Sequence, residues 1–465
     1  MMKNIKNIFK NSGIRSLTEN QDSFFKRLFY IFRAPKNKFF TVNNTVYLGW
    51  SLAVFLQKKY ERDCNILIGT DTRASGQWIK KRLFQGMKTD GHHIFDAGIV
   101  PTPFIAQAIK NTKCPQTQDH FFQLGIVITA SHNPAEYNGI KFLTPEGYLT
   151  IEEEMYISDI FHNILSPKYT PSSFFIQTIS PFDAISSYQA KIQKDLVASK
   201  KPSDMKILLD CAHGATSFIA KKIFAQYYSN IITINDDGDG TLINKNSGCS
   251  NPTLLLQAIH NHNADWGCAF DGDGDRVILA NNKGEIFDGD DMLVVLSQHP
   301  RFSQETTFAS TIMSNNAIQY YFEQNHKTFL RTDVGERNII QALKQNFAQL
   351  GSEACGHITI MNHAYCSDGI FAALLFFETI FTYPQALINL PKKFIQIHAN
   401  ISLNLLSLNE QEIQNIVSRM NRTILPGRII ARASNTEPLF RLTVEHPDIE
   451  IANQIMSTIK SNIIK

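Results

Sequence analysis

Short apolar runs alternate with longer helix-like segments along most of the chain. Buried strands are predicted at 65–69, 125–129, 205–210, 267–270 and 306–313. Helical stretches follow several of these runs, among them 219–228 and 314–324. The alternation predicts parallel α/β layers, with polar loops at the carboxyl ends of the strands. In open α/β sheets these ends are where ligands bind.

The pattern changes near residue 395. A strand at 394–403, a helix at 409–420, a hairpin around 432–438 and a final helix at 448–464 predict a small α+β domain. Proline and polar residues make 167–175 and 390–394 the best linker candidates. The predicted domains are 1–166, 167–281, 282–392 and 393–465.

Composition narrows the class of protein. The 465 residues suggest roughly 3–4 domains, and 43% hydrophobic with 19% charged residues is typical of a globular protein. A net charge of +3 is too small to indicate a nucleic-acid or membrane partner. The seven scattered cysteines, no two at a CxxC spacing, are interpreted as neither a disulfide framework nor a zinc site, so a reducing, cytoplasmic setting is expected. No apolar run reaches the roughly 18 residues of a membrane span, and the N-terminus lacks a secretory core.

The sequence DGDGDR carries the strongest chemical signal. Asp271, Asp273 and Asp275 alternate with glycines directly after an apolar strand. Converging carboxylates repel one another unless a cation lies between them, and such hard oxygen ligands suit Mg²⁺ or Ca²⁺. An EF-hand is excluded because Arg276 and Asn282 stand where that loop needs glycine and glutamate. The alternative is a solvated acidic turn.

A second polar loop, TASHNP, follows the predicted strand at 125–129. Ser131 precedes His132, but a serine needs an activating base, metal or modification to act as a nucleophile. Alone, the pair is more typical of turn chemistry. Asn138 and Gly139 are interpreted as a tight turn that places Lys141 on the next strand.

Two further loops bear polar clusters. The loop RASNTEP, with a nearby arginine, offers guanidinium, hydroxyl and N–H donors suited to a phosphate, or is an ordinary hairpin tip. Its candidate residues are Arg432, Ser434, Asn435, Thr436 and Arg441. The loop GSEACGH (351–357) resembles a nucleotide-binding P-loop in glycine spacing, but His357 replaces the required lysine, which excludes such a site.

Taken together and in their order along the chain, TASHNP, DGDGDR, GSEACGH and RASNTEP resemble the four loops of the α-D-phosphohexomutase family. The match extends from about residue 65 to the end of the chain. The resemblance implies three related α/β domains with mixed sheets and a C-terminal α+β domain around one central cleft. It also implies an isomerase that moves a phosphoryl group between two positions of a sugar through a phosphoserine enzyme.

The resemblance assigns residue roles as well. Ser131 would carry the phosphoryl group and, with Asp271, Asp273 and Asp275, hold one Mg²⁺ per active site. The remaining catalytic residues implied are His132, Lys141 and Arg276. The substrate-binding residues implied are Arg15, Glu353, Cys355, His357, Arg432, Ser434, Asn435, Thr436 and Arg441.

Within the family, the segments GTLINKNSGCS, TIMSNNAIQYYF and VGERNI resemble the branch that acts on glucosamine phosphates. That branch interconverts glucosamine 6-phosphate and glucosamine 1-phosphate, with glucosamine 1,6-bisphosphate as intermediate and activator, and supplies UDP-N-acetylglucosamine and cell-wall synthesis. The alternatives are a mannose- or glucose-phosphate mutase and a non-catalytic sugar-phosphate-binding protein. Expected partners are small sugar phosphates, with no nucleic acid or membrane, for a monomer or homodimer.

Two features depart from the family pattern. Cys355 stands where the family usually has serine, a better hydroxyl donor. The N-terminal motif is reduced to KNSGIRS, and the basic, aromatic segment 24–40 matches poorly. That segment is interpreted as a packed strand or helix with a solvated basic face, and alternatively as a membrane-surface or partner-binding segment.

Overall fold

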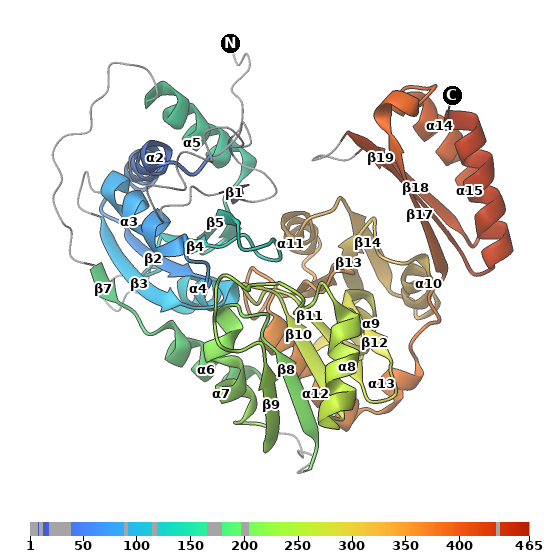
Figure 1. Cartoon of the computed structure of the whole chain (residues 1–465), viewed down its shortest axis with the longest axis horizontal. Helices are drawn as coiled ribbons and strands as arrows, with labels where there is room; N and C mark the ends of the chain where they lie inside the picture. Colours follow the sequence, from blue (N-terminus) through green and yellow to red (C-terminus); the bar gives the residue numbers. More distant parts are fainter. Residues whose placement is uncertain are drawn as a thin grey trace.

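The computed structural model describes residues 8, 13–17, 39–87, 92–113, 119–164, 179–196, 204–433 and 438–464. Within these residues the chain forms four β-sheets in succession (Figure 1). Three sheets are mixed and flanked by helices, and the last is antiparallel, so the predicted fold class is confirmed. Most of the segment 24–40 lies outside the described residues. In the described part of the chain, no helix combines the length and apolar character that crossing a membrane requires.

The first sheet has the order β1-β5-β4-β2-β3-β7, with β6 paired to β5. Alternate residues of its central strand face opposite layers: Ile66 and Ile68 pack beneath α2, α3 and α5, whereas Leu67 joins the core beside α4. Burial on both faces explains the uninterrupted apolar run in the sequence. The strands are β1 (Gly13–Leu17), β2 (Asn65–Thr70), β3 (His93–Ile99), β4 (Leu124–Ile128), β5 (Tyr137–Thr144), β6 (Gly147–Tyr148) and β7 (Ile179–Pro181). The helices are α2 (Val42–Tyr60), α3 (Gly76–Met87), α4 (Thr102–Asn111) and α5 (Ile151–Ile164).

The second sheet has the order β12-β11-β10-β8-β9. Leu208 packs with Leu255 and Ile259 of α8 on one face, while Leu209 belongs to the large core on the other. The strands are β8 (Lys206–Asp210), β9 (Asn230–Ile234), β10 (Trp266–Phe270), β11 (Val277–Asn281) and β12 (Ile286–Phe287). The helices are α6 (Ala184–Asp195), η1 (Ala215–Phe218), α7 (Ala220–Phe224) and α8 (Pro252–His262).

The third sheet has the order β14-β13-β15-β16. Helix α12 is apolar on all sides and buried from Gly369 to Ile380, as expected for a helix enclosed by other elements. Its side chains share the large core with those of the first two sheets. The strands are β13 (Thr307–Thr311), β14 (Thr328–Thr332), β15 (Leu350–Ser352) and β16 (Ile358–Ile360). The helices are α9 (Gly289–Ser297), η2 (Pro300–Phe302), α10 (Asn316–Gln324), α11 (Glu336–Gln345), α12 (Gly369–Thr382) and α13 (Gln385–Ile388).

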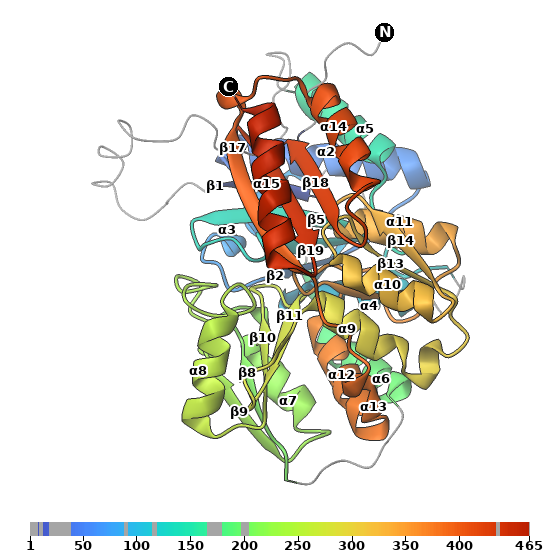
Figure 2. The same cartoon turned by 90° about the vertical axis from the view of Figure 1, so that its right-hand side faces the viewer.

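The fourth sheet, β17-β19-β18, has its own core. Helices α14 and α15 cover one of its faces (Figure 2), which leaves the other face to polar side chains. The elements are β17 (Ile395–Ser402), η3 (Leu403–Leu405), α14 (Glu410–Asn421), β18 (Arg428–Ala433), β19 (Leu439–His446) and α15 (Ile449–Ile463).

Two local predictions are wrong. Asn138 and Gly139 form no turn: both lie within β5, where a Cβ on Gly139 would approach the carbonyl oxygens of Ile14 and Thr129 to 2.5 Å. Glycine is therefore needed there for close strand packing, although Lys141 does lie on a strand as predicted. The helix predicted at 219–228 ends at Phe224, where the amides of Gln226 and Tyr227 bond to carbonyls three residues back, and β9 begins at 230.

The four predicted domain ranges stay a prediction. The sheets follow that order along the chain, but β7 lies beyond residue 166 and still pairs with β3 of the first sheet.

Candidate active site

The four motif loops are all connections between antiparallel neighbours. They join β4 to β5, β10 to β11, β15 to β16 and β18 to β19. The first three loops leave the carboxyl end of a strand that also has a parallel partner. Three of the four loops therefore lie at the strand ends where ligands bind in open α/β sheets.

Ser131 links the first sheet to the acidic loop of the second. Its side chain is buried, and its Oγ donates a hydrogen bond to Oδ2 of Asp271 at 2.8 Å. The backbone of Ser131 has φ of 53°, which is uncommon for residues other than glycine. Such a conformation persists where surrounding contacts hold the backbone in place. Its amide donates to Oγ1 of Thr129 at 2.9 Å, and its Oγ lies 3.4 Å from Nδ1 of His132. The backbone thus aims the hydroxyl at the carboxylates.

A buried guanidinium fixes this backbone. Arg73 donates to the carbonyl oxygens of Ser131 at 2.9 Å, Asn133 at 2.6 Å and Tyr137 at 2.9 Å, and also to that of Pro134. Its Nε donates to Oδ2 of Asp71 at 2.9 Å, and this ion pair is fully buried.

The second sheet contributes a further support. The side-chain amide of Asn244 donates to the carbonyl oxygens of Ser131 and Asn133, at 2.8 and 3.0 Å. Sequence reasoning assigned no role to Asp71, Arg73 or Asn244. The available signal was the charged sequence TDTRASG directly after a buried strand.

We expect Arg73→Lys to lower kcat about 10- to 100-fold with little change in KM. A lysine is a point charge and cannot reproduce the planar fork that holds several carbonyls, and misplacement of a reacting atom by about 1 Å costs on this scale. Steady-state kinetics with thermal melts check this, with Arg82→Lys on α3 as the matched control. An unchanged kcat in folded Arg73→Lys would show that the loop around Ser131 keeps its conformation without the Arg73 guanidinium.

The acidic loop gathers three buried carboxylates. One ligand oxygen each from Asp271, Asp273 and Asp275 lies within 4.8 Å of the others. Gly274 has φ of 69°, a conformation that favours glycine and lets the loop curl. Among the described residues, Oδ1 of Asp273 and of Asp275 are buried with no hydrogen-bond partner. Buried, unpaired carboxylate oxygens fit a hard divalent cation.

Cationic side chains face this cluster. Nζ of Lys141 donates to Oδ2 of Asp273 at 2.6 Å and also to Asp275. Burial alone would lower the pKa of Lys141, but the two carboxylates raise it above its usual value, so the ammonium stays charged. Burial and the neighbouring Asp275 and Asp273 raise the pKa of Asp271 well above its usual range. Like charges this close ionise together only with a compensating cation.

Two arginines add further positive charge near the three carboxylates. The backbone N–H of Arg276 donates to Oδ1 of Asp271 at 3.2 Å, and its Nε lies 3.9 Å from Oδ2 of the same carboxylate. Arg15 on β1 lies opposite Gly139, and its pKa is lowered by burial and by the charge of Arg276. A patch with two guanidinium groups beside the buried serine suits phosphate oxygens.

Both histidines of the site are neutral. The pKa of His132 is lowered to about 3, by burial first and then by Arg276 and Arg15. Burial, Arg276 and Lys141 hold the pKa of His357 well below its usual value. At neutral pH each ring therefore accepts or donates a hydrogen bond without carrying charge.

The loop GSEACGH, here called the sugar loop (351–357), docks on the acidic loop. Nε of Arg276 donates to Nε2 of His357 at 2.8 Å. Glu353 is buried, its Oε1 accepts the N–H of Gly335 at 3.0 Å, and burial raises its pKa. Cys355 is exposed at the turn. The structure thus brings Glu353, Cys355 and His357 to the same place as the carboxylates.

The fourth sheet contributes a separate pocket. Arg432 of β18 lies directly opposite Arg441 of β19, and both line a hollow of about 330 Å³ with His398 and Met313. Burial and the charge of Arg441 lower the pKa of Arg432. Two adjacent guanidinium groups favour an anion. Ser434, Asn435 and Thr436 lie outside the described residues.

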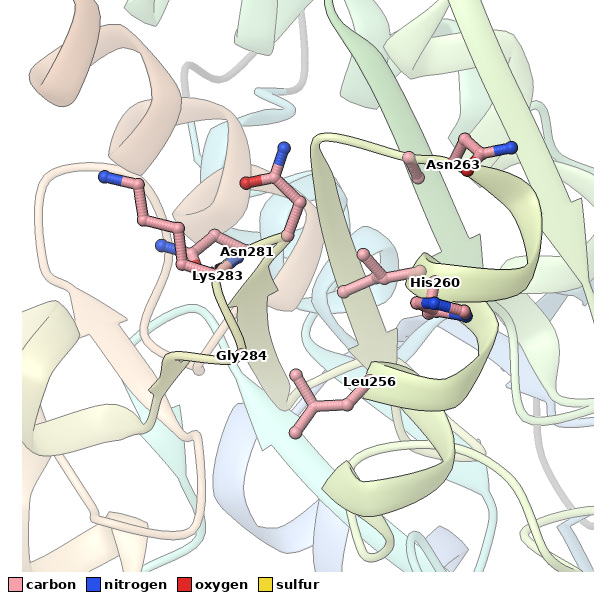
Figure 3. A pocket seen from close by; sticks show the side chains of 9 residues that line it. Leu256, His260, Asn263, Asn281, Lys283 and Gly284 are labelled. Atoms are coloured by element: carbon pink, nitrogen blue, oxygen red, sulfur yellow. Dashed lines mark hydrogen bonds between the residues drawn. The ribbon is translucent and has the colours of Figure 1, made fainter.

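Another hollow, of about 500 Å³, lies between α8 and the turn from β11 to β12 (Figure 3). None of its lining residues is one of the predicted site residues, and its lining holds no carboxylate and no hydroxyl or thiol. It therefore lacks the groups for phosphoryl transfer. The lining residues labelled in the figure are Leu256, His260, Asn263, Asn281, Lys283 and Gly284.

Comparison with known families covers most of the chain. The three α/β/α domains of phosphoglucomutase/phosphomannomutase match in order: domain I over residues 30–168, domain II over 186–284 and domain III over 288–396.

Individual relatives agree with this match. A phosphoglucosamine mutase of Carboxydothermus hydrogenoformans is 31% identical over 447 residues, which cover 93% of this chain and 98% of that protein. A solved phosphoglucomutase/phosphomannomutase family protein of Burkholderia thailandensis shares the fold, with a TM-score of 0.77, 21% identity and coverage of 97% and 95%. The N-acetylphosphoglucosamine mutase of Aspergillus fumigatus, solved with GlcNAc-6P and magnesium, has a TM-score of 0.55 at 16% identity and covers 77% of this chain and 90% of its own.

Proposed function

The chain belongs to the α-D-phosphohexomutase family, and from this premise we propose that it interconverts glucosamine 6-phosphate and glucosamine 1-phosphate. Relatives about 30% identical over 93% of the chain are named phosphoglucosamine mutase. The observation that carries the proposal is the 2.8 Å hydrogen bond from Oγ of Ser131 to Asp271. It joins a buried hydroxyl to a carboxylate cluster across two sheets, the arrangement that phosphoryl transfer to serine requires.

Ser131 is the proposed phosphoryl carrier. Phosphoserine gives its phosphoryl group to the free hydroxyl of the substrate, which forms a 1,6-bisphosphate and leaves the serine hydroxyl. The bisphosphate turns over, and Ser131 takes the other phosphoryl group. Because the transition state of phosphoryl transfer is loose, neutral His132 need only accept a hydrogen bond from the attacking hydroxyl.

Asp271, Asp273, Asp275 and an oxygen of the phosphoserine are the proposed ligands of one Mg²⁺. The ion, when bound, neutralises charge on the phosphoryl oxygens. Lys141 and Arg276 supply further positive charge beside the serine, so the developing charge is compensated without rearrangement. The Aspergillus protein of the same fold was solved with magnesium, which supports Mg²⁺ as the ion.

Substrate positioning is assigned to the remaining residues. Glu353, Cys355 and His357 would hold sugar groups, and Arg15 would contact the phosphate near Ser131. The phosphate at the other end of the sugar would bind the fourth sheet, where remote binding energy helps to position the reacting end. The proposed phosphate ligands there are Arg432, Ser434, Asn435, Thr436 and Arg441.

The substrate is tested by kcat/KM for the 1-phosphates of glucosamine, glucose and mannose, each with its 1,6-bisphosphate as activator. We expect glucosamine 1-phosphate to have the highest value, since the cationic 2-amino group needs a carboxylate and Glu353 is the carboxylate of the sugar loop. A faster reaction with glucose or mannose 1-phosphate would replace this substrate by the alternative branch. Cys355, a weaker hydrogen-bond partner than serine, would loosen the discrimination among these sugars.

The reaction is placed in the cytoplasm, where its product would supply UDP-N-acetylglucosamine for the cell wall. A monomer or a homodimer would serve equally, because all the proposed residues come from one chain.

A further inference from the structure

The turn of the sugar loop carries three different metal-binding side chains. Glu353, Cys355 and His357 each offer one ligand atom, and these atoms all lie within 4.8 Å of one another. The turn is tight: the N–H of Glu353 donates to the carbonyl of His357 and the N–H of Gly356 to that of Glu353, both at 2.9 Å. Gly356 has φ of 99°, which permits this reversal. The three donors are therefore held together by the backbone, before any ligand is considered.

This donor set differs from the acidic loop in kind. Three carboxylates select a hard cation such as Mg²⁺, whereas a thiolate, an imidazole and a carboxylate select Zn²⁺. The scattered cysteines alone predict no zinc site, because no two have ligand spacing. The structure supplies the missing partners, a glutamate and a histidine on the same turn.

One of the three donors is exposed to solvent, whereas Glu353 and His357 are buried. Cys355 is the exposed cysteine among the six that the structure describes. Oε2 of Glu353 lies 4.0 Å from Nε2 of His357. That nitrogen accepts the Nε–H of Arg276, so a cation would have to displace one hydrogen bond. The positive charge of Arg276 lies close to Cys355 and favours the thiolate that forms on binding, which in turn offsets that charge.

We propose that the sugar loop binds one Zn²⁺ through Glu353, Cys355 and His357, and that the bound ion excludes the sugar phosphate. On binding, the thiol proton is released to solvent as the metal–sulfur bond forms. The exclusion, but not the binding, rests on the proposed function, in which the same side chains hold the sugar. Zinc then inhibits in competition with sugar phosphate and separately from magnesium.

The binding is tested with Co²⁺, which replaces Zn²⁺ and gives a thiolate-to-metal charge-transfer band. The full-length protein is titrated in saturating Mg²⁺, so that the acidic loop is filled. We expect a thiolate band that saturates at one Co²⁺ per chain and is lost in Cys355→Ser. Cys64→Ala, which removes a buried cysteine from the core of the first sheet, is the control that keeps the band.

The exclusion is tested by Zn²⁺ inhibition at several sugar-phosphate concentrations, with each variant compared with its own zinc-free rate. We expect competitive inhibition in the wild type and an inhibition constant at least about tenfold higher in Cys355→Ser. A missing band, or one that survives in Cys355→Ser, would overturn the zinc site. Equal inhibition of both proteins that saturating Mg²⁺ relieves would assign zinc to the acidic loop instead.

The two proposals fail separately. A cobalt band in a protein that turns over no hexose phosphate would keep the metal site and reject the proposed function. Normal mutase turnover with no band would reject the metal site alone.

Discussion

Ser131→Ala is expected to lower mutase turnover by on the order of a thousandfold or more while the protein stays folded, because the variant has no group that can carry the phosphoryl. The side chain that is lost makes two hydrogen bonds, one to Asp271 and a longer one to Nδ1 of His132. The backbone of the loop remains held by Arg73 and Asn244, which bond to carbonyl oxygens and not to the serine side chain. The chemistry should therefore fail without collapse of the site.

Three measurements on the same preparations check this expectation. Intact-protein mass spectrometry should find one phosphoryl group on the wild type and none on Ser131→Ala. Circular dichroism and thermal melts should be similar for the two. Ser303→Ala, at an exposed serine, is the matched control. Turnover above about one hundredth of the wild-type rate in Ser131→Ala would show that another group accepts the phosphoryl.

The central strands of the three α/β sheets were predictable because they are buried on both faces. The segments 65–69, 125–129 and 267–270 are uninterrupted apolar runs, and each matches a strand to within about a residue or two. What the runs could not give is strand direction. The neighbours that return antiparallel, β5 and β11, are as buried as the parallel strands, so apolar pattern does not separate them. The turn predicted at Asn138–Gly139 was wrong for a similar reason, because composition alone does not separate a turn from a strand. The glycine is needed there for close packing within β5.

The site was only partly predictable, for a related reason. The acidic loop could be identified locally, because repeated carboxylates are costly without a cation. Ser131 could not, since its significance lies in a contact with Asp271, 140 residues away. Arg73 could not be identified either, because it binds main-chain carbonyl groups, which every residue has and which no sequence pattern marks. The resemblance of four loops in order supplied what local chemistry left open.

Removal of divalent cations is expected to abolish turnover, and added Mg²⁺ to restore it. Asp273→Asn should raise the Mg²⁺ concentration needed for half-maximal activity about 10- to 100-fold. The substitution removes one of the charges that compensate the cation. It also places an amide where Oδ2 of Asp273 accepts from Nζ of Lys141 at 2.6 Å and from Oγ1 of Thr102 at 2.5 Å. An amide nitrogen in that position would face two hydrogen-bond donors. The substitution would therefore disturb the conformation of the acidic loop and also reduce its negative charge.

The chain contains its own control for this experiment. Asp239 belongs to a second acidic, glycine-containing stretch, DDGDG (236–240), but is exposed and only caps its own turn through Thr241. Asp239→Asn should leave the Mg²⁺ requirement unchanged, because a solvated carboxylate has neither the burial nor the neighbours that make a cation necessary. Full activity in excess chelator, or equal Mg²⁺ requirements for the two variants, would mean that DGDGDR is also a simple acidic turn. The buried, unpaired oxygens of Asp273 and Asp275 argue that the two loops will behave differently.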